Sequence, residues 1–151
     1  MTDKAAAVTT QDLWVRLFQA RSADDYLSNF PSAEEMPAFS DYISGLCAAR
    51  SEKPERVIRR GGLESSYGHR LFSGMRRPSR DTALQLAFGF DMNVDEAQTL
   101  LKAARVAPLH PKVKRDAVIA YGLYRRRTLE EVQISLVEYG LPPLGGARNA
   151  D

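Results

Sequence analysis

The stretch Lys53–Arg80, KPERVIRRGGLESSYGHRLFSGMRRPSR, decides the fold of this chain. Pro54 suits the first turn of a helix, since the N–H that proline lacks has no intrahelical partner there. The short helix that follows ends at Gly61-Gly62. A second helix is expected to begin near Ser65 and to end at Gly74, because glycine favours the left-handed backbone of a helix end. A short helix, a glycine turn and a second helix have the spacing of a helix-turn-helix.

Apolar residues in the rest of the chain recur with helical periodicity, and no segment shows the sustained apolar/polar alternation of a β-strand. Ser79 and two capping boxes, Asn93 with Glu96 and Thr128 with Glu131, mark three further helix starts. The chain is therefore predicted to be all-α. Besides the two central helices, we expect helices over residues 11–21, 24–29, 36–50, 80–88, 94–105, 112–125 and 129–139.

The last two pairs of predicted helices form an internal repeat. An offset of 35 residues aligns, without a gap, residues 80–109 (RDTALQLAFGFDMNVDEAQTLLKAARVAPL) with residues 115–144 (RDAVIAYGLYRRRTLEEVQISLVEYGLPPL). Seven of the thirty positions are identical, and they include the Arg-Asp pair that opens each segment. Either the two segments are equivalent helical hairpins, or two amphipathic hairpins resemble each other because the same physics shapes both.

Charge is distributed unevenly along the chain. The formal net charge is +2, yet residues 1–40 carry a net −3, whereas residues 56–80 carry seven arginines and one acid, Glu64. Such a block is typical of a polyanion-binding surface. The alternative is a solvated face whose arginines pair with acids. A second basic run, Arg125–Arg127, lies at a predicted helix end, where the helix dipole favours cations; a further phosphate contact is the other interpretation of that run.

The central stretch and its tail resemble the Xre/Cro, or lambda-repressor-like, family. The resemblance is carried by Gly62 in the turn, by Leu63 directly after it, by Leu71 late in the second helix, and by the tail Ser73–Ser79 (SGMRRPS) before a leucine-rich helix. It covers residues 39–101, and the whole chain resembles a longer variant with an added N-terminal helix and a C-terminal helical hairpin. The resemblance implies a helix-turn-helix bundle, with extra helices at both ends, that binds duplex DNA.

Four parts of the chain follow from this comparison. We expect an N-terminal helical extension over residues 1–35, a DNA-binding core over 36–109, a helical hairpin over 110–144 and a disordered tail over 145–151. The additions contain apolar residues, among them Trp14, Phe18, Tyr139 and Leu141, that are typical of a contact surface. Because repressor-like units usually read two half-sites, we expect a homodimer formed through these additions. The terminal helices could also bind a protein partner.

Two positions depart from the family pattern. The family usually has a small residue at the position of Ile58 and a bulky apolar residue at that of Gly68, so the sizes are exchanged here. These positions are expected to face each other where the two central helices cross. A large Ile58 opposite Gly68 preserves the total volume, which is the kind of change that cores tolerate best. A glycine within a helix costs roughly 1 kcal/mol relative to alanine.

The resemblance also assigns roles in DNA binding, because the second helix of such folds lies in the major groove with its N-terminal residues near base edges. Base contacts are assigned to Ser65, Ser66, His69 and Arg70, and Arg70 suits the bidentate contact with guanine. Phosphate contacts, which set affinity and register, are assigned to Lys53, Tyr67, Arg76, Arg77 and Arg80. Ser65 and Ser66 are equally good helix caps, and Tyr67 is an equally good core residue.

Several functional classes are disfavoured. His69 and His110 have no cysteine or glutamate at metal-ligand spacing, and no phosphate-binding loop or nucleophile motif is present, so we expect neither an enzyme nor a metal or cofactor site. No segment approaches the roughly 18–20 apolar residues of a membrane span, and residues 1–10 do not have the pattern of a secretory signal. Cys47, the only cysteine, lies in an apolar helical stripe and is expected to be buried and inert. We therefore expect a cytoplasmic protein.

The function predicted from the sequence is specific binding of duplex DNA by a transcriptional regulator. The alternative is a protein-interaction module that has the same fold and uses its basic face to bind an acidic protein. The glycine at position 68 and the modest total charge favour this alternative slightly.

Overall fold

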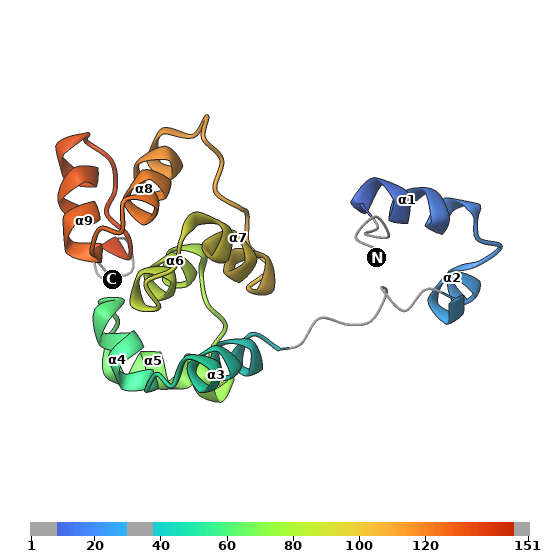
Figure 1. Ribbon diagram of the computed structural model, residues 1–151, viewed down its shortest axis with the longest axis horizontal. Coiled ribbons are helices and arrows are strands. Elements are labelled where there is room, and N and C mark those ends of the chain that lie inside the picture. Colours follow the sequence, from blue (N-terminus) through green and yellow to red (C-terminus); the bar gives the residue numbers. More distant parts are fainter. Residues whose placement is uncertain (1–8, 30–37, 147–151) are drawn as a thin grey trace, which may run out of the picture. The chain divides into compact units, whose positions relative to one another are not determined.

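The computed structural model describes residues 9–29 and 38–146. These ranges contain nine helices and no strand, so the all-α prediction is confirmed (Figure 1). The chain divides into two compact units, which separate between Met36 and Pro37. From residue 37 on, the predicted core (36–109) and the predicted hairpin (110–144) therefore belong to a single unit.

The first unit consists of α1 (Thr10–Gln19) and α2 (Ala23–Asn29). Thr9 and Asp12 form a capping box at the start of α1. The rings of Trp14 and Phe18 stack at a centroid distance of 5.6 Å. Both side chains are nonetheless exposed, at 51% and 76%. Two helices of this length do not bury the apolar face of α1.

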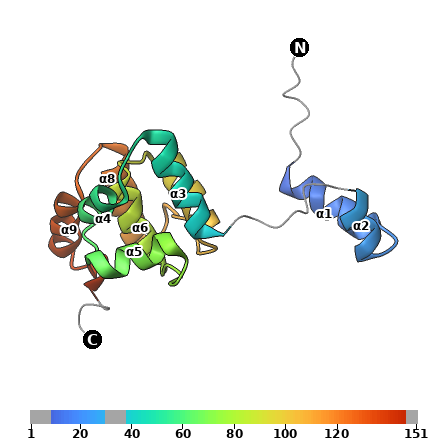
Figure 2. The same cartoon turned by 90° about the horizontal axis from the view of Figure 1, so that it is seen from below.

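The second unit is built around one central helix. Its elements are α3 (Phe39–Arg50), α4 (Pro54–Arg60), α5 (Ser65–Ser73), α6 (Arg80–Gly89), α7 (Val94–Ala103), α8 (Lys114–Tyr124) and α9 (Leu129–Glu138). Every residue of α6 from Thr82 to Gly89 is buried. Helix α6 contacts α4, α7 and α9, and both views place it in the middle of the unit (Figures 1 and 2).

A continuous hydrophobic core joins all seven helices of this unit. Its fully buried residues come from successive helices and include Ile43, Leu71, Leu84, Leu100, Ile119 and Leu136. Cys47 belongs to this core, as predicted. Burial raises the pKa of the Cys47 thiol, and the negative charge of Glu52 adds to the effect, which keeps the thiol protonated and unreactive.

The two halves of the repeat make the same hydrogen bonds. In the first copy the Gln98 side chain donates to the carbonyl of Leu109 at 2.9 Å and accepts from its N–H at 2.7 Å. In the second copy Gln133 makes the same pair of bonds to Leu144, again at 2.9 and 2.7 Å. Since each atom pair recurs 35 residues later, the repeat is structural and extends beyond a shared amphipathic pattern.

The two copies are also joined to each other by reciprocal ion pairs. The Arg80 guanidinium donates to both carboxylate oxygens of Asp116, at 3.0 and 2.8 Å. Arg115, the counterpart of Arg80, donates to both oxygens of Asp81, at 2.9 and 3.0 Å. Such an exchange of partners is typical of a two-fold relationship, here between the starts of α6 and α8.

Backbone N–H groups complete this arrangement. The N–H of His110 donates to Asp116, and the N–H of Gly145, which lies 35 residues later, donates to Asp81. Gly145 is consequently buried, so the packed chain continues past the predicted boundary at residue 144. The rest of the predicted tail, residues 147–151, lies outside the described residues.

Helix boundaries differ from the prediction by a few residues. Helix α3 is described from Phe39, and the predicted start at Met36 lies outside the described residues. Helix α8 begins at Lys114, because the preceding residues form a turn in which the N–H of Lys112 donates to Nδ1 of His110. Helix α7 ends at Ala103, and Arg105 then adopts a left-handed backbone with φ 61°.

Candidate nucleic-acid interface

The α4–α5 pair is held in place by its turn. Gly62 has φ 67°, a backbone conformation that glycine adopts without strain. The Gln85 side chain donates to the carbonyl of Gly61 at 3.1 Å, which ties the turn to the central helix. Gly74 ends α5 with φ 86°, as predicted. These contacts fix the point at which the chain leaves α4 and the direction in which α5 starts.

Helix α5 is capped by Glu64, and neither serine is the cap. The Glu64 carboxylate accepts from the N–H of Tyr67 at 2.8 Å. The N–H groups of Tyr67 and Ser66 hold the pKa of Glu64 below its ordinary value, with a smaller contribution from the Arg70 charge. The interpretation of Ser65 and Ser66 as helix caps is therefore wrong. Both serines lie in the first turn of the helix with exposed side chains.

The predicted base-contact residues share one side of α5. Ser65, Ser66, His69 and Arg70 are all exposed. Ser66 and His69 are three residues apart, and the pairs Ser65–His69 and Ser66–Arg70 are four apart, so these side chains are neighbours on the helix surface. The opposite side of α5 is packed, with Gly68 and Leu71 buried. The structure thus brings all four predicted residues together on one exposed, polar face of α5.

Unpaired cations flank this face. Lys53 caps the start of α4 and is exposed, as are Arg76 and Arg77 in the loop after α5. Arg56, on the exposed side of α4, was not among the predicted contact residues, although it lies in the basic block. None of these four side chains forms an ion pair with another described residue. The alternative in which the block is neutralised by acids therefore does not hold for them.

Two arginines of the block do have acidic partners. Arg60 donates to both oxygens of Glu52, at 2.8 and 2.7 Å. Arg80 is bound more completely, since its Nε and Nη2 also donate to the carbonyls of Ala107 and Pro108 at 2.9 Å. The prediction that Arg80 contacts phosphate is not supported by this geometry, because its donors are used within the protein.

Tyr67 has the core role, one of the two roles considered for it. Its ring is half-buried against the core, and its hydroxyl lies 3.1 Å from the Thr82 hydroxyl at the start of α6. The Arg76 guanidinium lies 6.0 Å from the ring centroid, within the range of a cation–π contact. Tyr67 thus anchors α5 to α6 and supports Arg76, and a direct phosphate contact by Tyr67 stays a prediction.

The second basic run caps α8 and packs on an aromatic ring. Arg125 and Arg127 each lie 5.7 Å from the centroid of the Tyr121 ring. Arg126 donates to the carbonyl of Asp91 at 2.6 Å. These contacts, together with the dipole of α8, account for the run within the protein.

Other kinds of site are not found in the part of the chain that the structure describes. No group of three or more His, Cys, Asp or Glu side chains there has an arrangement suited to a metal ion. Among residues 9–29 and 38–146, no helix has both the length and the apolar character needed to cross a membrane.

Comparison with protein-family models, with curated proteins and with solved structures gives no match for this chain. The resemblance to the Xre/Cro family and the role of α5 in DNA binding thus stay predictions based on the residues.

Proposed function

We propose that this chain is a transcriptional regulator that binds duplex DNA through α4 and α5 as a helix-turn-helix. The observation that carries the proposal is the outward face of α5, where Ser65, Ser66, His69 and Arg70 are exposed side by side. One side of a short helix therefore carries only polar groups that can donate to or accept from base edges. The other side is fixed against the core, so the polar groups are presented on a rigid support.

The chemistry of this face suits the major groove, which is wide enough to admit an α-helix. Arg70 has the planar donor fork that pairs with O6 and N7 of guanine. The serine hydroxyls can donate or accept, so they are compatible with several bases. His69, near the middle of the same face, adds a second donor within reach of an adjacent base pair.

The flanking cations suit the two sugar-phosphate backbones that border a major groove. Lys53 and Arg56 belong to α4, whereas Arg76 and Arg77 follow α5. Contacts of this kind supply most of the affinity and set the register, while the base contacts supply the preference for sequence. Arg76 is supported by the ring of Tyr67, which restricts its orientation.

A protein-interaction module is the second candidate function. The observation that favours it is a set of exposed apolar side chains on α8, α9 and the residue after α9: Tyr121, Tyr124, Ile134, Val137 and Tyr139. Apolar groups on one hairpin are typical of a surface that contacts another protein.

A titration of the full chain with a random-sequence duplex at several salt concentrations tests the proposal. If Lys53, Arg56, Arg76 and Arg77 each neutralise one phosphate, log K should fall with log salt with a slope of about −3.5. Fluorescence anisotropy of a labelled duplex measures this slope. No binding at low salt, or an affinity that does not change with salt, would contradict DNA binding and favour the interaction module.

A further inference from the structure

A small cavity lies between three elements of the second unit that are distant in sequence. It has a volume of about 180 Å³ and is lined by the start of α3 (Ala38 to Ser40), by the loop after α5 and by the end of α7. One water molecule requires roughly 10–15 Å³ of such volume, so the cavity can hold a polyatomic ion with some of its water.

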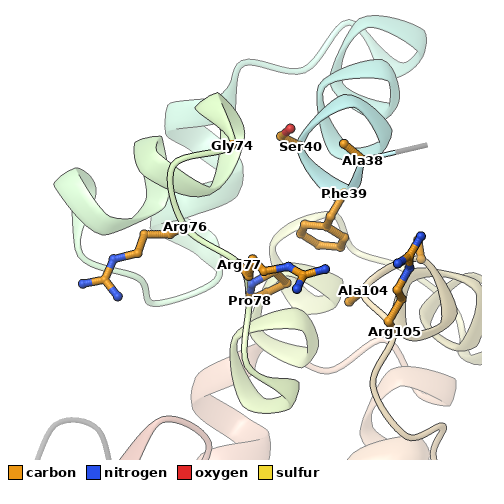
Figure 3. Close-up of a pocket in the computed structure, with 10 residues that line it drawn as sticks. Ala38, Phe39, Ser40, Gly74, Arg76, Arg77, Pro78, Ala104 and Arg105 are labelled. Atoms are coloured by element: carbon orange, nitrogen blue, oxygen red, sulfur yellow. The ribbon is translucent and has the colours of Figure 1, made fainter. Parts of the chain in front are cut away.

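The charged residues that line this cavity are all positive. Arg76, Arg77 and Arg105 line it, and no Asp or Glu is among its described lining residues. Figure 3 shows that the guanidinium groups of Arg77 and Arg105 extend from opposite sides toward the space beside Phe39, whereas Arg76 points away. Neither Arg77 nor Arg105 forms an ion pair with another described residue. Both side chains are exposed, so their donors are accessible to an anion that enters this space.

Two features of the cavity's wall strengthen this argument. Ala38, the residue at the cap position of α3, provides no side-chain hydrogen bond, so the first N–H groups of the helix have no side-chain acceptor from the cap, although Asp41 in the first turn complements the helix dipole. Arg105 adopts φ 61°, whereas its counterpart in the repeat, at φ 73°, is Gly140. An arginine thus occupies a backbone conformation that favours glycine, and its side chain extends toward the cavity.

We propose that this cavity is an oxyanion site that binds a phosphate group between Arg77 and Arg105, with the first N–H groups of α3 as further donors. The guanidinium fork matches the oxygen spacing of phosphate and binds it in a bidentate manner. The proposal deepens the proposed function where the phosphate belongs to a DNA backbone. It stands independently where the phosphate is a free ion or part of a small molecule.

The first experiment titrates the full chain with inorganic phosphate at constant ionic strength and follows the arginine Nε–H and backbone N–H signals by nuclear magnetic resonance. Saturable shifts are expected for Arg77, Arg105 and Ser40. Arg105→Gln should weaken the saturable response of Arg77 at least tenfold, and Arg76→Gln, which changes a side chain turned away from the cavity, should preserve it. If Arg105→Gln does not fold, Arg77→Gln serves the same purpose, with the response of Arg105 as the readout.

The second experiment identifies the source of the phosphate by measuring duplex binding of the same variants. A salt slope that becomes about one unit less steep in Arg105→Gln indicates a backbone phosphate. An unchanged slope, together with loss of phosphate binding, indicates a free or small-molecule phosphate. Shifts that do not saturate, or that are equal at Arg76 and Arg105, would mean a general salt effect and would overturn the proposal. Because the first experiment contains no DNA, its result does not depend on whether the chain binds a duplex.

Discussion

Ile58 fills the space that a side chain at Gly68 would need. A Cβ atom added to Gly68 would lie 2.5 Å from Cγ2 and 2.7 Å from Cγ1 of Ile58. Both residues are buried, and Ile58 is only 3% exposed. The helices α4 and α5 can therefore approach closely because the larger residue is on α4. Ile58 and Gly68 thus share one space where α4 and α5 cross, as predicted.

This contact predicts that the effect of Gly68→Ala on stability changes sign when Ile58 is also replaced by alanine. In the natural chain, Gly68→Ala should be destabilising, because an overpacked crossing costs about 1–3 kcal/mol. That cost outweighs the roughly 1 kcal/mol by which alanine is the better helix former. Ile58→Ala alone should cost about 2–5 kcal/mol, because it leaves a cavity. In the Ile58→Ala background, however, Gly68→Ala should be stabilising, because its methyl group enters that cavity.

Denaturant unfolding of the two single variants and the double variant measures this coupling. Gly45 provides a matched control, because it lies within α3 and a Cβ there would meet nothing within 4 Å. Gly45→Ala should therefore stabilise the protein by about 1 kcal/mol in either background. Additive effects of the changes at Ile58 and Gly68 would show that the two side chains do not share one space.

The reciprocal ion pairs predict that Arg80 and Arg115 stabilise the fold to a similar degree. Arg80→Gln should destabilise the protein by about 1.5–3 kcal/mol, because it leaves the buried Asp116 carboxylate without its charged donors. Arg115→Gln should cost a similar amount through Asp81. Arg76→Gln, at an exposed position without an ion pair, should remain within about 0.5 kcal/mol of the natural protein. Urea unfolding provides the comparison, and a neutral Arg80→Gln would contradict the assignment.

Asp81 makes part of this stability dependent on pH. Partial burial acts to raise the pKa of Asp81, but the donors Arg115 and Gly145 and the charges of Arg115 and Arg80 outweigh it, so the pKa is lowered. Because the pKa is lowered in the folded state, the ionised carboxylate stabilises the fold at pH values above the unfolded-state pKa, about 3.9. This stabilisation is lost as the pH falls through the folded-state pKa. Unfolding between pH 7 and pH 2 should therefore show a weaker acid dependence in Asp81→Asn. An unchanged acid dependence would mean that this carboxylate is not held by its partners.

The fold was largely predictable from the sequence because its determinants are local. The capping boxes at Asn93 and Thr128 and the helix end at Gly74 depend on residues within one turn, and the structure contains each of them. The boundary at Gly145 was missed because its N–H is held by Asp81, which is 64 residues distant. Contacts of that separation have no signature in the periodicity of a single segment.

The candidate site was predictable only in part, for the same reason. The exposure of Ser65, Ser66, His69 and Arg70 follows from the amphipathic pattern of α5. The partner of Arg80 was not predicted, because Asp116 comes from the second copy of the repeat. The Arg-Asp pair that opens each copy was the signal that could have identified this contact. The sequence gives no sign that Arg105 and Arg77 line one cavity, because they come together only through the packing of the end of α7 near the loop after α5.

The exposed rings of α1 predict how the chain forms a dimer. Trp14 and Phe18 lie together on a helix that has little core of its own, so burial against a second copy would remove apolar surface from water. Sedimentation should show a dimer for the natural chain and a monomer for Trp14→Glu with Phe18→Glu. The matched control, Tyr121→Glu with Tyr139→Glu on the hairpin, should remain dimeric. A monomeric natural chain, both free and on a palindromic duplex, would exclude this assembly.

The positions of the arginines around α5 predict that they contribute differently to DNA binding. Arg70 lies on the exposed face of the helix, whereas Arg76 and Arg77 lie in the loop that follows it. Arg70→Ala should therefore reduce discrimination at one base pair by about 1–3 kcal/mol, while it changes binding to random duplexes little. Arg76→Ala with Arg77→Ala should weaken binding to all duplexes about equally and should make the salt slope about two units less steep.

Selection of preferred sequences from a random duplex pool, followed by binding to each single-base variant, measures both effects. Glu64 must be unchanged in every variant, because its carboxylate caps α5 and its loss would alter the whole face. Arg59→Ala, an exposed change on α4 outside the proposed contacts, controls for the loss of one positive charge. If Arg70→Ala leaves the preferred sequence intact while the loop changes alter it, the loop reads the bases and α5 contacts the backbone. That result would reverse the roles of the two elements even if the affinity and its dependence on salt were as expected.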